Sequence, residues 1–385
     1  MSAVATRAAT TADVVAAVTD AAACGTALRV VGARTWLDAG RPVRADADLL
    51  DVRALGSVLH YTPGDLTCTV GAGMTIAELD ALTAAQGQWC PLMPWGGDAG
   101  TVGATLATAT AGPCAATLGL PRDLALGLEL VDGRGSVLRA GGSVVKNVAG
   151  FDLVRLNVGA WGSLGVITAA SLRLRARPAV DRTFALPFDD AAATSRVEAL
   201  RTGALVPLAL ELVNATAAAA LGLGPQACAL VRVGGNAAFV NACELALRAG
   251  GALAEAPSEV WTRLRAIEPE HASTWRESVS PSRWPALARA IQHGGDDDGR
   301  VVFAHCSVLR GVLRVSTQLR EGDDPYVAGG RWRTTPSVIR ERPAADPSLS
   351  AEATHSFRVP TTEALSQRVR EAFDPASVLN PGILG

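Results

Sequence analysis

Two glycine-rich runs contain the residues whose types and spacing are best suited to binding a charged group. The first, PWGGDAGTVGATLATATAGP, covers residues 94–113, and the second, KNVAGFDLVRLNVGAWGSLGVIT, covers residues 146–168. Glycine is used where the main chain approaches another group closely or adopts a positive φ. Both runs offer main-chain N–H groups and few charged side chains. This pattern predicts a site for a large, flat, anionic cofactor whose phosphates are held by the main chain.

The cysteines do not have the spacing of a metal site. No two form a CxxC pair, and none lies near a histidine at zinc-ligand spacing. We therefore expect no iron–sulfur cluster and no other metal in this chain. An odd number of cysteines on hydrophobic segments indicates buried free thiols in a reducing cytoplasm. The seven are Cys24, Cys68, Cys90, Cys114, Cys228, Cys243 and Cys306.

The composition is that of a folded protein with more than one domain. The chain has 385 residues, 49% hydrophobic and 19% charged, and it exceeds the roughly 250–300 residues at which a single core stops growing. The net charge of −2 gives no electrostatic reason to expect nucleic acid or an anionic membrane as a partner. We see no signal peptide, and Glu211 and Asn214 interrupt the most apolar stretch, residues 204–224. The sequence therefore predicts a cytoplasmic protein without a membrane span.

The first half of the chain alternates short helices and strands. Thr10–Asp13 and Thr75–Glu78 have the spacing of capping boxes, so each predicts the start of a helix. The order is not the regular βαβ alternation of a dinucleotide fold, and Ile76 replaces the third glycine of a GxGxxG pattern. The predicted elements are helices at 10–25, 75–87 and 104–112, strands at 27–32 and 66–74, a hairpin turning at Asp132-Gly133, and a closing turn and strand at 162–177.

From Pro178 onward, alanine-rich helices alternate with short strands. This alternation favours a smaller domain with a largely antiparallel sheet. GGDDDG, at 294–299, lacks the ligand spacing of an EF-hand and is interpreted as a solvated turn. The predicted elements are helices at 190–202, 236–250 and 361–373, strands within 208–214, 227–235 and 301–316, and a long connecting loop at 321–352.

The two glycine-rich runs and the ending FDPASVLNPG, residues 373–382, resemble the FAD-binding domain of the vanillyl-alcohol-oxidase/PCMH flavoprotein superfamily. Within it they are most similar to the family of FAD-binding subunits (E subunits) of bacterial glycolate oxidase, a three-subunit enzyme. The resemblance implies an α+β fold: a two-subdomain PCMH-type FAD-binding domain at 1–177 and a smaller α/β cap domain, with a largely antiparallel sheet, at 178–330. Residues 331–385 would be a connecting loop and a C-terminal segment that returns to the FAD domain.

The resemblance also implies that FAD is the cofactor. The alternatives for the glycines are a turn packed for steric reasons alone and a tight hairpin beside a bulge. No histidine lies in either loop, so Cys114 is the candidate for covalent attachment of the flavin. We prefer to interpret Cys114 as a buried thiol and therefore predict non-covalent FAD. The residues expected at the cofactor fall in three places. Gly32 begins the loop at 32–40, here called the first loop; the other two sets are Gly97, Gly100, Thr101, Val102 and Gly103 at the pyrophosphate, and Gly162, Ser163, Leu164, Gly165 and Val166 around the cofactor.

Three more residues are expected near the flavin or where the cap domain meets it: Lys146, which is the only lysine, Asn147 and Asp152. The structural alternative is an ion pair between Lys146 and Asp152. Asn380 is expected to bond the polar edge of the flavin ring, and its alternative is a turn that ends a helix.

Oxidation of a 2-hydroxy acid at a flavin requires a base for the hydroxyl proton and a cation for the carboxylate. No residue pair stands out for these roles. The candidates are Lys146, His305, His355 and Arg358, with Arg331 and Arg333 as further cations; His60, His271 and His293 are interpreted as ordinary surface or core residues.

Three functions fit these observations. The first is an FAD-binding subunit of a complex that oxidises a small hydroxy acid, whose partners would be a second FAD-containing catalytic subunit and an iron–sulfur subunit. Such partners could hold the chain at the inner membrane. The second is a self-sufficient FAD-dependent oxidoreductase of another small alcohol or hydroxy acid. The third is a scaffold subunit that has lost its flavin, which is favoured by the first loop, where only Gly32 and Gly40 remain.

Overall fold

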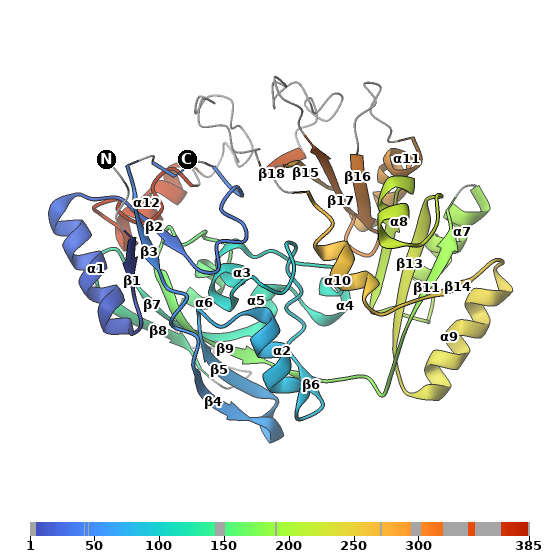
Figure 1. Ribbon diagram of the computed structural model, residues 1–385, viewed down its shortest axis with the longest axis horizontal. Helices are drawn as coiled ribbons and strands as arrows, with labels where there is room; N and C mark the ends of the chain where they lie inside the picture. The colour runs from blue at the N-terminus through green and yellow to red at the C-terminus, as the bar shows by residue number, and fades with distance from the viewer. Residues whose placement is uncertain are drawn as a thin grey trace. The chain divides into compact units, whose positions relative to one another are not determined.

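The structure is a computed structural model, and it divides into two compact units, each described here by itself (Figure 1). Unit 1 comprises Met1–Gly112, Gly119–Arg177 and Phe357–Gly385, and unit 2 comprises Pro113–Leu118 and Pro178–Ser356. The described residues are 5–41, 43–44, 46–142, 151–188, 191–269, 272–293, 302–318, 338–342 and 363–383. The candidates outside these ranges are Lys146, Asn147, His271, Arg331, Arg333, His355 and Arg358.

One part of unit 1 is a three-stranded parallel sheet with the order β1-β3-β2. Helix α1 begins with the predicted capping box, in which Thr10 and Asp13 bond each other's main chain, and ends at Gly25, whose φ is 68°. Its apolar face packs on this sheet in one core that also contains Val378 and Leu379 from the C-terminal segment. The elements are β1 (Ala5–Arg7), α1 (Thr11–Cys24), β2 (Leu28–Val31) and β3 (Asp48–Asp51).

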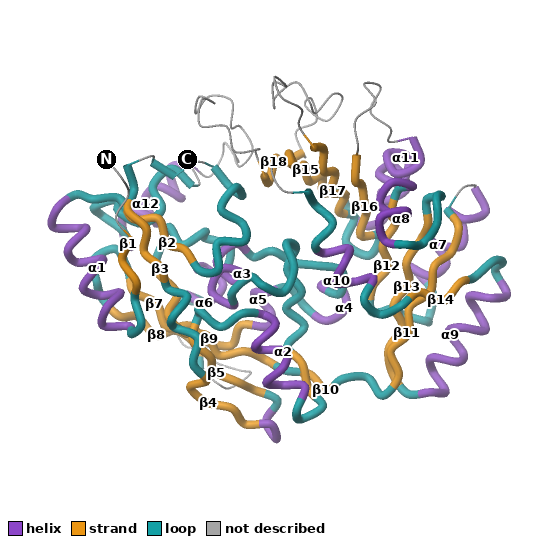
Figure 2. Tube along the Cα trace, viewed as in Figure 1, coloured by secondary structure: helices purple, strands orange, loops and turns teal. Residues whose placement is uncertain are grey.

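The other part of unit 1 is a five-stranded antiparallel sheet with the order β4-β5-β9-β7-β8 (Figure 2). The predicted hairpin joins β7 to β8 through residues 132–136, and the Asp132 carboxylate accepts hydrogen bonds from the main chain of Arg134 and Ser136. The strands are β4 (Val58–Thr62), β5 (Thr67–Gly71), β7 (Ala125–Val131), β8 (Val137–Gly141) and β9 (Val166–Arg173).

Short helices connect the strands of unit 1. Helix α2 begins with the second predicted capping box, Thr75 and Glu78, and ends at Ala84, three residues before the predicted end. The elements are η1 (Pro63–Asp65), α2 (Ile76–Ala84), α3 (Val102–Thr108), α5 (Pro121–Leu124), α6 (Leu153–Asn157) and α12 (Glu363–Phe373), with β6 (Gln88–Trp89) pairing with β10 (Arg175–Ala176).

Unit 2 is built on an eight-stranded antiparallel sheet with the order β14-β11-β13-β12-β16-β17-β15-β18. One face packs against α7, α9 and α11 in a core that includes Phe184, Val197, Leu247 and Trp284. The strands are β11 (Val180–Pro187), β12 (Ala209–Val213), β13 (Cys228–Gly235), β14 (Ala254–Ala256), β15 (Ala272–Ser278), β16 (Val302–Ser307), β17 (Val312–Gln318) and β18 (Val338–Arg342). The helices are α4 (Ala115–Leu118), α7 (Ala191–Thr202), α8 (Ala215–Leu221), α9 (Ala237–Ala249), α10 (Val260–Arg265), η2 (Pro281–Arg283) and α11 (Trp284–His293).

The α+β fold class and the antiparallel sheet of the second half are confirmed. The prediction of a continuous connecting loop at 321–352 is wrong at 338–342, because these residues form β18 beside β15. An edge strand paired on one side is held mainly by its neighbour's main chain, so a polar sequence such as VIRER can form it.

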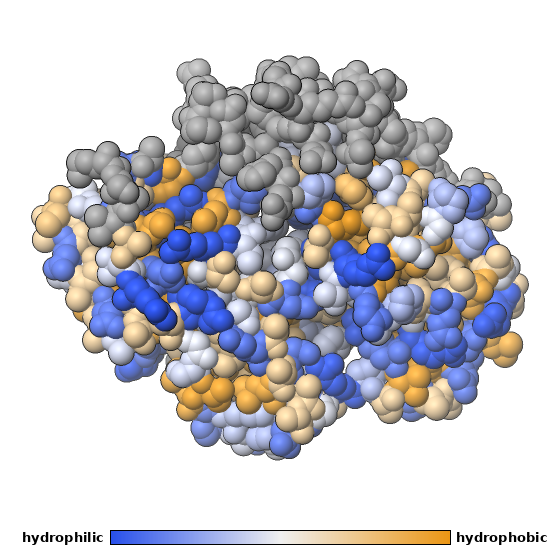
Figure 3. Space-filling model, viewed as in Figure 1, coloured by the Kyte–Doolittle hydropathy of each residue, from blue (hydrophilic) through white to orange (hydrophobic). Residues whose placement is uncertain are grey.

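The exposed surface mixes polar and apolar residues (Figure 3). An apolar area lies over β4 and β5 at the lower edge of unit 1 in this view. On edge strand β4, Val58 is 45% exposed and Leu59 is 57% exposed, so this sheet edge presents apolar side chains to the surface. No helix in the described ranges is long and apolar enough to cross a membrane.

Candidate functional site: a cationic pocket in unit 1

A pocket in unit 1 is formed by five segments of the sequence. They are β2 with the loop that follows it, Val52 after β3, α3, the turn into β9, and Asn380 with Ile383 near the C-terminus. Seven residues predicted at the cofactor line this pocket: Gly32, Thr101, Gly103, Gly162, Gly165, Val166 and Asn380. The described lining residues do not include Gly97, Gly100, Val102, Leu164 or Asp152.

The first loop and the first glycine-rich run pack directly against each other. A Cβ on Gly32 would lie 2.5 Å from the Oγ1 of Thr101, so only glycine fits there. Gly96, at φ 89°, would bring a Cβ to 3.3 Å from the indole of Trp36, and a Cβ on Gly100 would lie 3.5 Å from the Oγ1 of Thr35. Part of the glycine pattern therefore serves contact between the two loops.

The main-chain N–H groups of Val102 and Gly103 were predicted to bind the pyrophosphate, and the structure corrects this prediction. The N–H of Val102 donates to the carbonyl of Met74 at 2.8 Å, and the N–H of Gly103 donates to the carbonyl of Ala72 at 2.8 Å. Neither group is available to a phosphate. A Cβ on Gly103 would lie 2.7 Å from the Cβ of Ala72, so this glycine is required for steric reasons.

The second glycine-rich run and the C-terminal segment meet at Asn380. The Asn380 side chain accepts a hydrogen bond from the N–H of Val30 at 2.8 Å and donates one to the carbonyl of Trp161 at 2.9 Å. A Cβ on Gly162, at φ 68°, would lie 2.6 Å from the Asn380 amide nitrogen. In this structure the Asn380 amide holds two walls of the pocket together, and its Oδ1 and Nδ2 are both engaged by the main chain.

The other residues predicted at the cofactor are buried or make hydrogen bonds within the protein. Leu164 and Val102 are buried apolar residues. Asp152 is the N-cap of α6 and accepts a hydrogen bond from the N–H of Arg155 at 2.9 Å. Ser163 is buried and donates to the carbonyl of Ala160 at 2.7 Å. Gly97 adopts a φ of 86°, and the carbonyl of Gly100 accepts from the N–H of Ile76.

The pocket is apolar with a positive charge. Its described lining includes Arg29 and Arg34 and no aspartate or glutamate, and the rest is mainly valine, alanine, glycine, Trp36 and Trp161. Burial lowers the pKa of Arg29, and nearby Asp38 opposes this effect. An apolar lining that includes two arginines suits a ligand that combines a flat aromatic part with an anionic part. The residues present therefore fit a flavin nucleotide.

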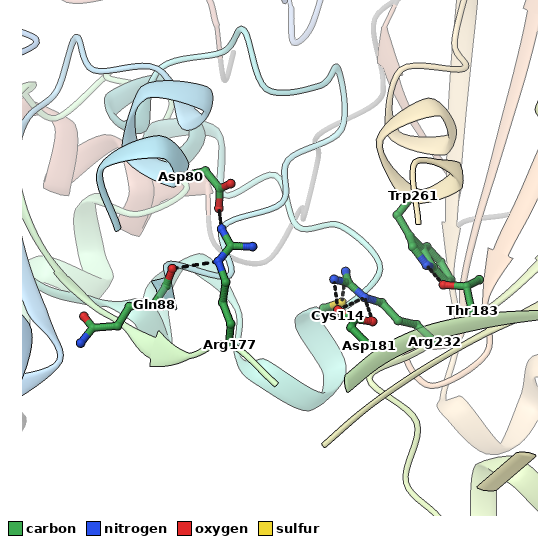
Figure 4. A network of polar contacts seen from close by, with 8 residues as sticks. All are labelled: Asp80, Gln88, Cys114, Arg177, Asp181, Thr183, Arg232 and Trp261. Atoms are coloured by element: carbon green, nitrogen blue, oxygen red, sulfur yellow. Dashed lines mark hydrogen bonds and ion pairs between the residues drawn. The ribbon is translucent and has the colours of Figure 1, made fainter. Parts of the chain in front are cut away.

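Cys114, the candidate for a covalent link, belongs to unit 2. Its thiol is fully buried and accepts a hydrogen bond from the Arg232 guanidinium at 3.6 Å, while Arg232 also pairs with Asp181 (Figure 4). Burial raises the pKa of the Cys114 thiol to about 11, and the charge of Arg232 offsets only part of this rise. A buried, protonated thiol is a poor nucleophile, which supports the interpretation of Cys114 as structural.

Arg177, by contrast, lies in unit 1, where it pairs with Asp80 and donates to the carbonyl of Gln88 at 3.0 Å (Figure 4). These contacts fix the end of the Gly119–Arg177 segment to α2 and β6. Trp261 and Thr183, the remaining pair in the view, form a hydrogen bond of 2.7 Å within unit 2.

Unit 2 has a buried polar cluster on the sheet face opposite its core. Side chains alternate along a strand, so His305 and Ser307 of β16 lie on the other face from Ala304 and Cys306, which belong to the core. The His305 Nδ1 is 3.3 Å from the Oε2 of Glu211, and both side chains are at most 3% exposed. Within the described part of the chain, Glu211 Oε1 and Ser307 Oγ have no hydrogen-bond partner.

Comparison with known proteins identifies the class of domain that contains the pocket. Residues 2–141 match the model of the FAD binding domain family. Together with the relatives below, this match supports an FAD-binding domain of the PCMH type, and FAD is the cofactor. The predicted cofactor is thus confirmed. The described residues contain no group of three or more histidine, cysteine, aspartate or glutamate side chains that could hold a metal ion.

The relatives are oxidases and dehydrogenases. The chain is 38% identical over 154 residues to glycolate oxidase subunit GlcE of Escherichia coli, which is 40% of this chain and 43% of the relative. It is 29% identical to glycolate oxidase subunit GlcD of Bacillus subtilis over 42% of this chain and 34% of the relative. It is 36% identical to a D-lactate dehydrogenase of Archaeoglobus fulgidus over 37% of this chain and 32% of the relative. The match therefore spans less than half the length of each of these relatives.

The fold resembles solved structures over nearly all of the chain. An alkyldihydroxyacetonephosphate synthase superposes with a TM-score of 0.71 over 98% of this chain and 76% of that one, at 16% sequence identity. This likeness concerns the fold alone.

Sequence reasoning missed the arginines and tryptophans that line the pocket: Arg29, Arg34, Trp36 and Trp161. The signal that could have found Arg34 and Trp36 is their position between Gly32 and Gly40 in a loop that follows a buried strand. Arg29 and Trp161 gave no such signal, because their place in the wall depends on how β2 and the turn before β9 approach each other.

Proposed function

We propose that the chain is the FAD-binding subunit of an oxidoreductase complex that acts on a small 2-hydroxy acid. The observation that carries the proposal is the cationic, apolar pocket within an FAD-binding domain whose relatives include two glycolate oxidase subunits. FAD supplies two-electron redox chemistry when it is bound. The partners in this proposal are a second FAD-containing catalytic subunit and an iron–sulfur subunit, with a cytoplasmic location or one at the inner membrane through these partners.

One observation favours a second candidate, in which this chain oxidises the hydroxy acid or another small alcohol by itself. The Glu211–His305 pair is buried on the sheet face of unit 2, and Glu211 Oε1 and the hydroxyl of Ser307 have no partner within the described residues. A carboxylate that orients an imidazole is the usual arrangement of a general base. In this candidate, His305 takes the hydroxyl proton of the substrate.

An anaerobic absorbance experiment separates the two candidates. The protein is purified alone and mixed with glycolate, D-lactate or L-lactate without oxygen. Under the second candidate the flavin absorbance bleaches, and His305→Gln slows bleaching at least about 100-fold. His60→Gln is the control, because His60 is an exposed histidine that contacts Thr62.

Under the first candidate the flavin remains oxidised in the isolated chain. It then becomes reduced when the co-expressed partner subunits and substrate are added, whether or not His305 is replaced. A purified chain that neither contains flavin nor takes up added FAD would contradict both candidates.

A further inference from the structure

The charged side chains that line the pocket come from β2 and the first loop, and not from the first glycine-rich run. Val102 and Gly103 use their main-chain N–H groups to bond Met74 and Ala72. Gly96 is packed closely against the indole of Trp36 in the first loop. A diphosphate in this pocket therefore needs donors from elsewhere in the wall, and Arg29 and Arg34 are the charged residues among the described lining.

The two arginines differ in how much freedom their side chains have. The guanidinium of Arg29 is partly buried and donates to the carbonyl of Leu37, so it fixes the shape of the loop. Arg34 is 43% exposed and pairs with Asp51 at 2.9 Å, and this carboxylate is 22% exposed. An ion pair so open to water is weak, so its arginine can turn to a stronger anion at low cost.

The backbone at Arg34 points to a role for its side chain. Arg34 has a φ of 60°, in the left-handed region that residues with a Cβ rarely adopt. Glycine would take this conformation without strain, and the neighbouring loop positions Gly32 and Gly40 are glycines. Among the described non-glycine residues with a positive φ, Arg34 has the charged side chain, and it lines the pocket. Backbone strain of this kind is found at ligand-binding loops.

We propose that Arg34 binds the diphosphate of FAD, leaving Asp51 and donating its guanidinium N–H groups to phosphate oxygens. Guanidinium is well matched to phosphate because its planar fork can donate two parallel hydrogen bonds. The first loop thus binds the diphosphate through a side-chain charge, which accounts for a loop with few glycines in a domain that still binds FAD.

The test is the affinity of apoprotein for FAD, measured by flavin fluorescence quenching, together with thermal unfolding of the apoprotein. Arg34→Gly removes the charge and relieves the positive φ. We expect FAD to bind at least about tenfold more weakly, while the apoprotein unfolds at the same or a higher temperature. Arg34→Lys keeps the charge and should recover part of the affinity. The matched control is Arg139→Gly, because Arg139 also pairs with a carboxylate in unit 1, that of Glu129, and does not line the pocket.

The salt dependence gives a second measurement. Affinity of the natural chain for FAD should fall as salt rises from about 0.05 to 0.5 M, because salt screens the arginine–phosphate attraction. The Arg34→Gly variant should lose much of this dependence, whereas Arg139→Gly should keep it. Unchanged FAD affinity in Arg34→Gly would overturn the proposal. So would weaker binding together with an unchanged salt dependence, because Arg34 would then act only through the shape of the loop. If the natural chain itself failed to bind FAD, the assignment of the cofactor would be at fault and not only the role of Arg34.

Discussion

The side chain of Asn380 and the main chain of Trp161 are 219 positions apart in the sequence and are joined by a hydrogen bond of 2.9 Å. The same amide accepts from the N–H of Val30 at 2.8 Å. One residue near the C-terminus therefore links β2 to the turn that precedes β9. These are two walls of the candidate pocket, so the C-terminal segment contributes to the site that we propose for FAD.

Replacement of Asn380 should lower both the unfolding free energy of the protein and its affinity for FAD. Asn380→Ala leaves the Val30 N–H and the Trp161 carbonyl without their partner, at a cost of about 1–3 kcal/mol each in unfolding free energy. Asn380 has a φ of 45°, so Asn380→Gly should be about 1 kcal/mol more stable than Asn380→Ala. Urea unfolding and FAD titration of both variants would measure this. Equal stability of the two variants would show that the positive φ is not maintained.

Gly103 should tolerate no larger residue. In Gly103→Ala the new Cβ would lie 2.7 Å from the Cβ of Ala72 and 3.0 Å from its carbonyl oxygen. We expect a loss of about 1–3 kcal/mol in unfolding free energy and weaker FAD binding, since Gly103 lines the pocket. Gly64→Ala is the control, because a Cβ there would meet nothing within 4 Å. A Gly103→Ala protein as stable as the control would contradict the close packing of α3 on residue 72.

The flavin should be released without cleavage of a bond. Because Cys114 is fully buried and burial raises the pKa of its thiol to about 11, it should not form a thioether to the flavin. Acid precipitation should leave all flavin in the supernatant, and Cys114→Ser should contain as much FAD as the natural chain. Flavin fluorescence retained on the denatured chain in a gel, and lost in Cys114→Ser, would show that Cys114 is a covalent attachment site.

The contribution of Glu198 to the stability of unit 2 should be lost at low pH. Hydrogen bonds from Arg201 and from the indole N–H of Trp284 lower the pKa of Glu198 from 4.5 to about 2. Because the pKa in the folded state is lowered, the stabilisation is fully present above pH 4.5 and is lost as the pH falls toward 2.

This pH dependence can be measured by urea unfolding, followed by tryptophan fluorescence. The natural chain should be more stable than Glu198→Gln above pH 4.5, and the difference should shrink as the pH falls toward 2. The predicted effect is modest, since Glu198 is 42% exposed. A difference between the two proteins that did not change with pH would rule out the carboxylate as its source.

Local sequence patterns predicted much of the secondary structure. Thr10–Asp13 and Thr75–Glu78 started helices where their spacing predicted, and Gly25 ended one, because a capping box and a left-handed C-cap involve only residues within one turn. The hairpin at Asp132 is equally local, since the aspartate bonds the main chain two and four residues further on. The glycine-rich runs and the ending also indicated the cofactor, which the match to the FAD-binding domain confirmed.

Only the tertiary structure decided which hydrogen-bond partners the main-chain and side-chain groups of the candidate site residues have. Val102 and Gly103 bond carbonyls that lie about thirty positions earlier in the chain, in the segment after β5. Asn380 bonds β2, and Cys114 lies beside Arg232 of β13. Spacing along a chain reports which residues share a turn or a strand face, whereas hydrogen bonds between distant segments depend on how those segments pack. The sequence therefore determined the glycine-rich loops and the cofactor that they indicate. The packing of those loops determined that the N–H groups of Val102 and Gly103 bond the main chain and that Arg34 lines the pocket.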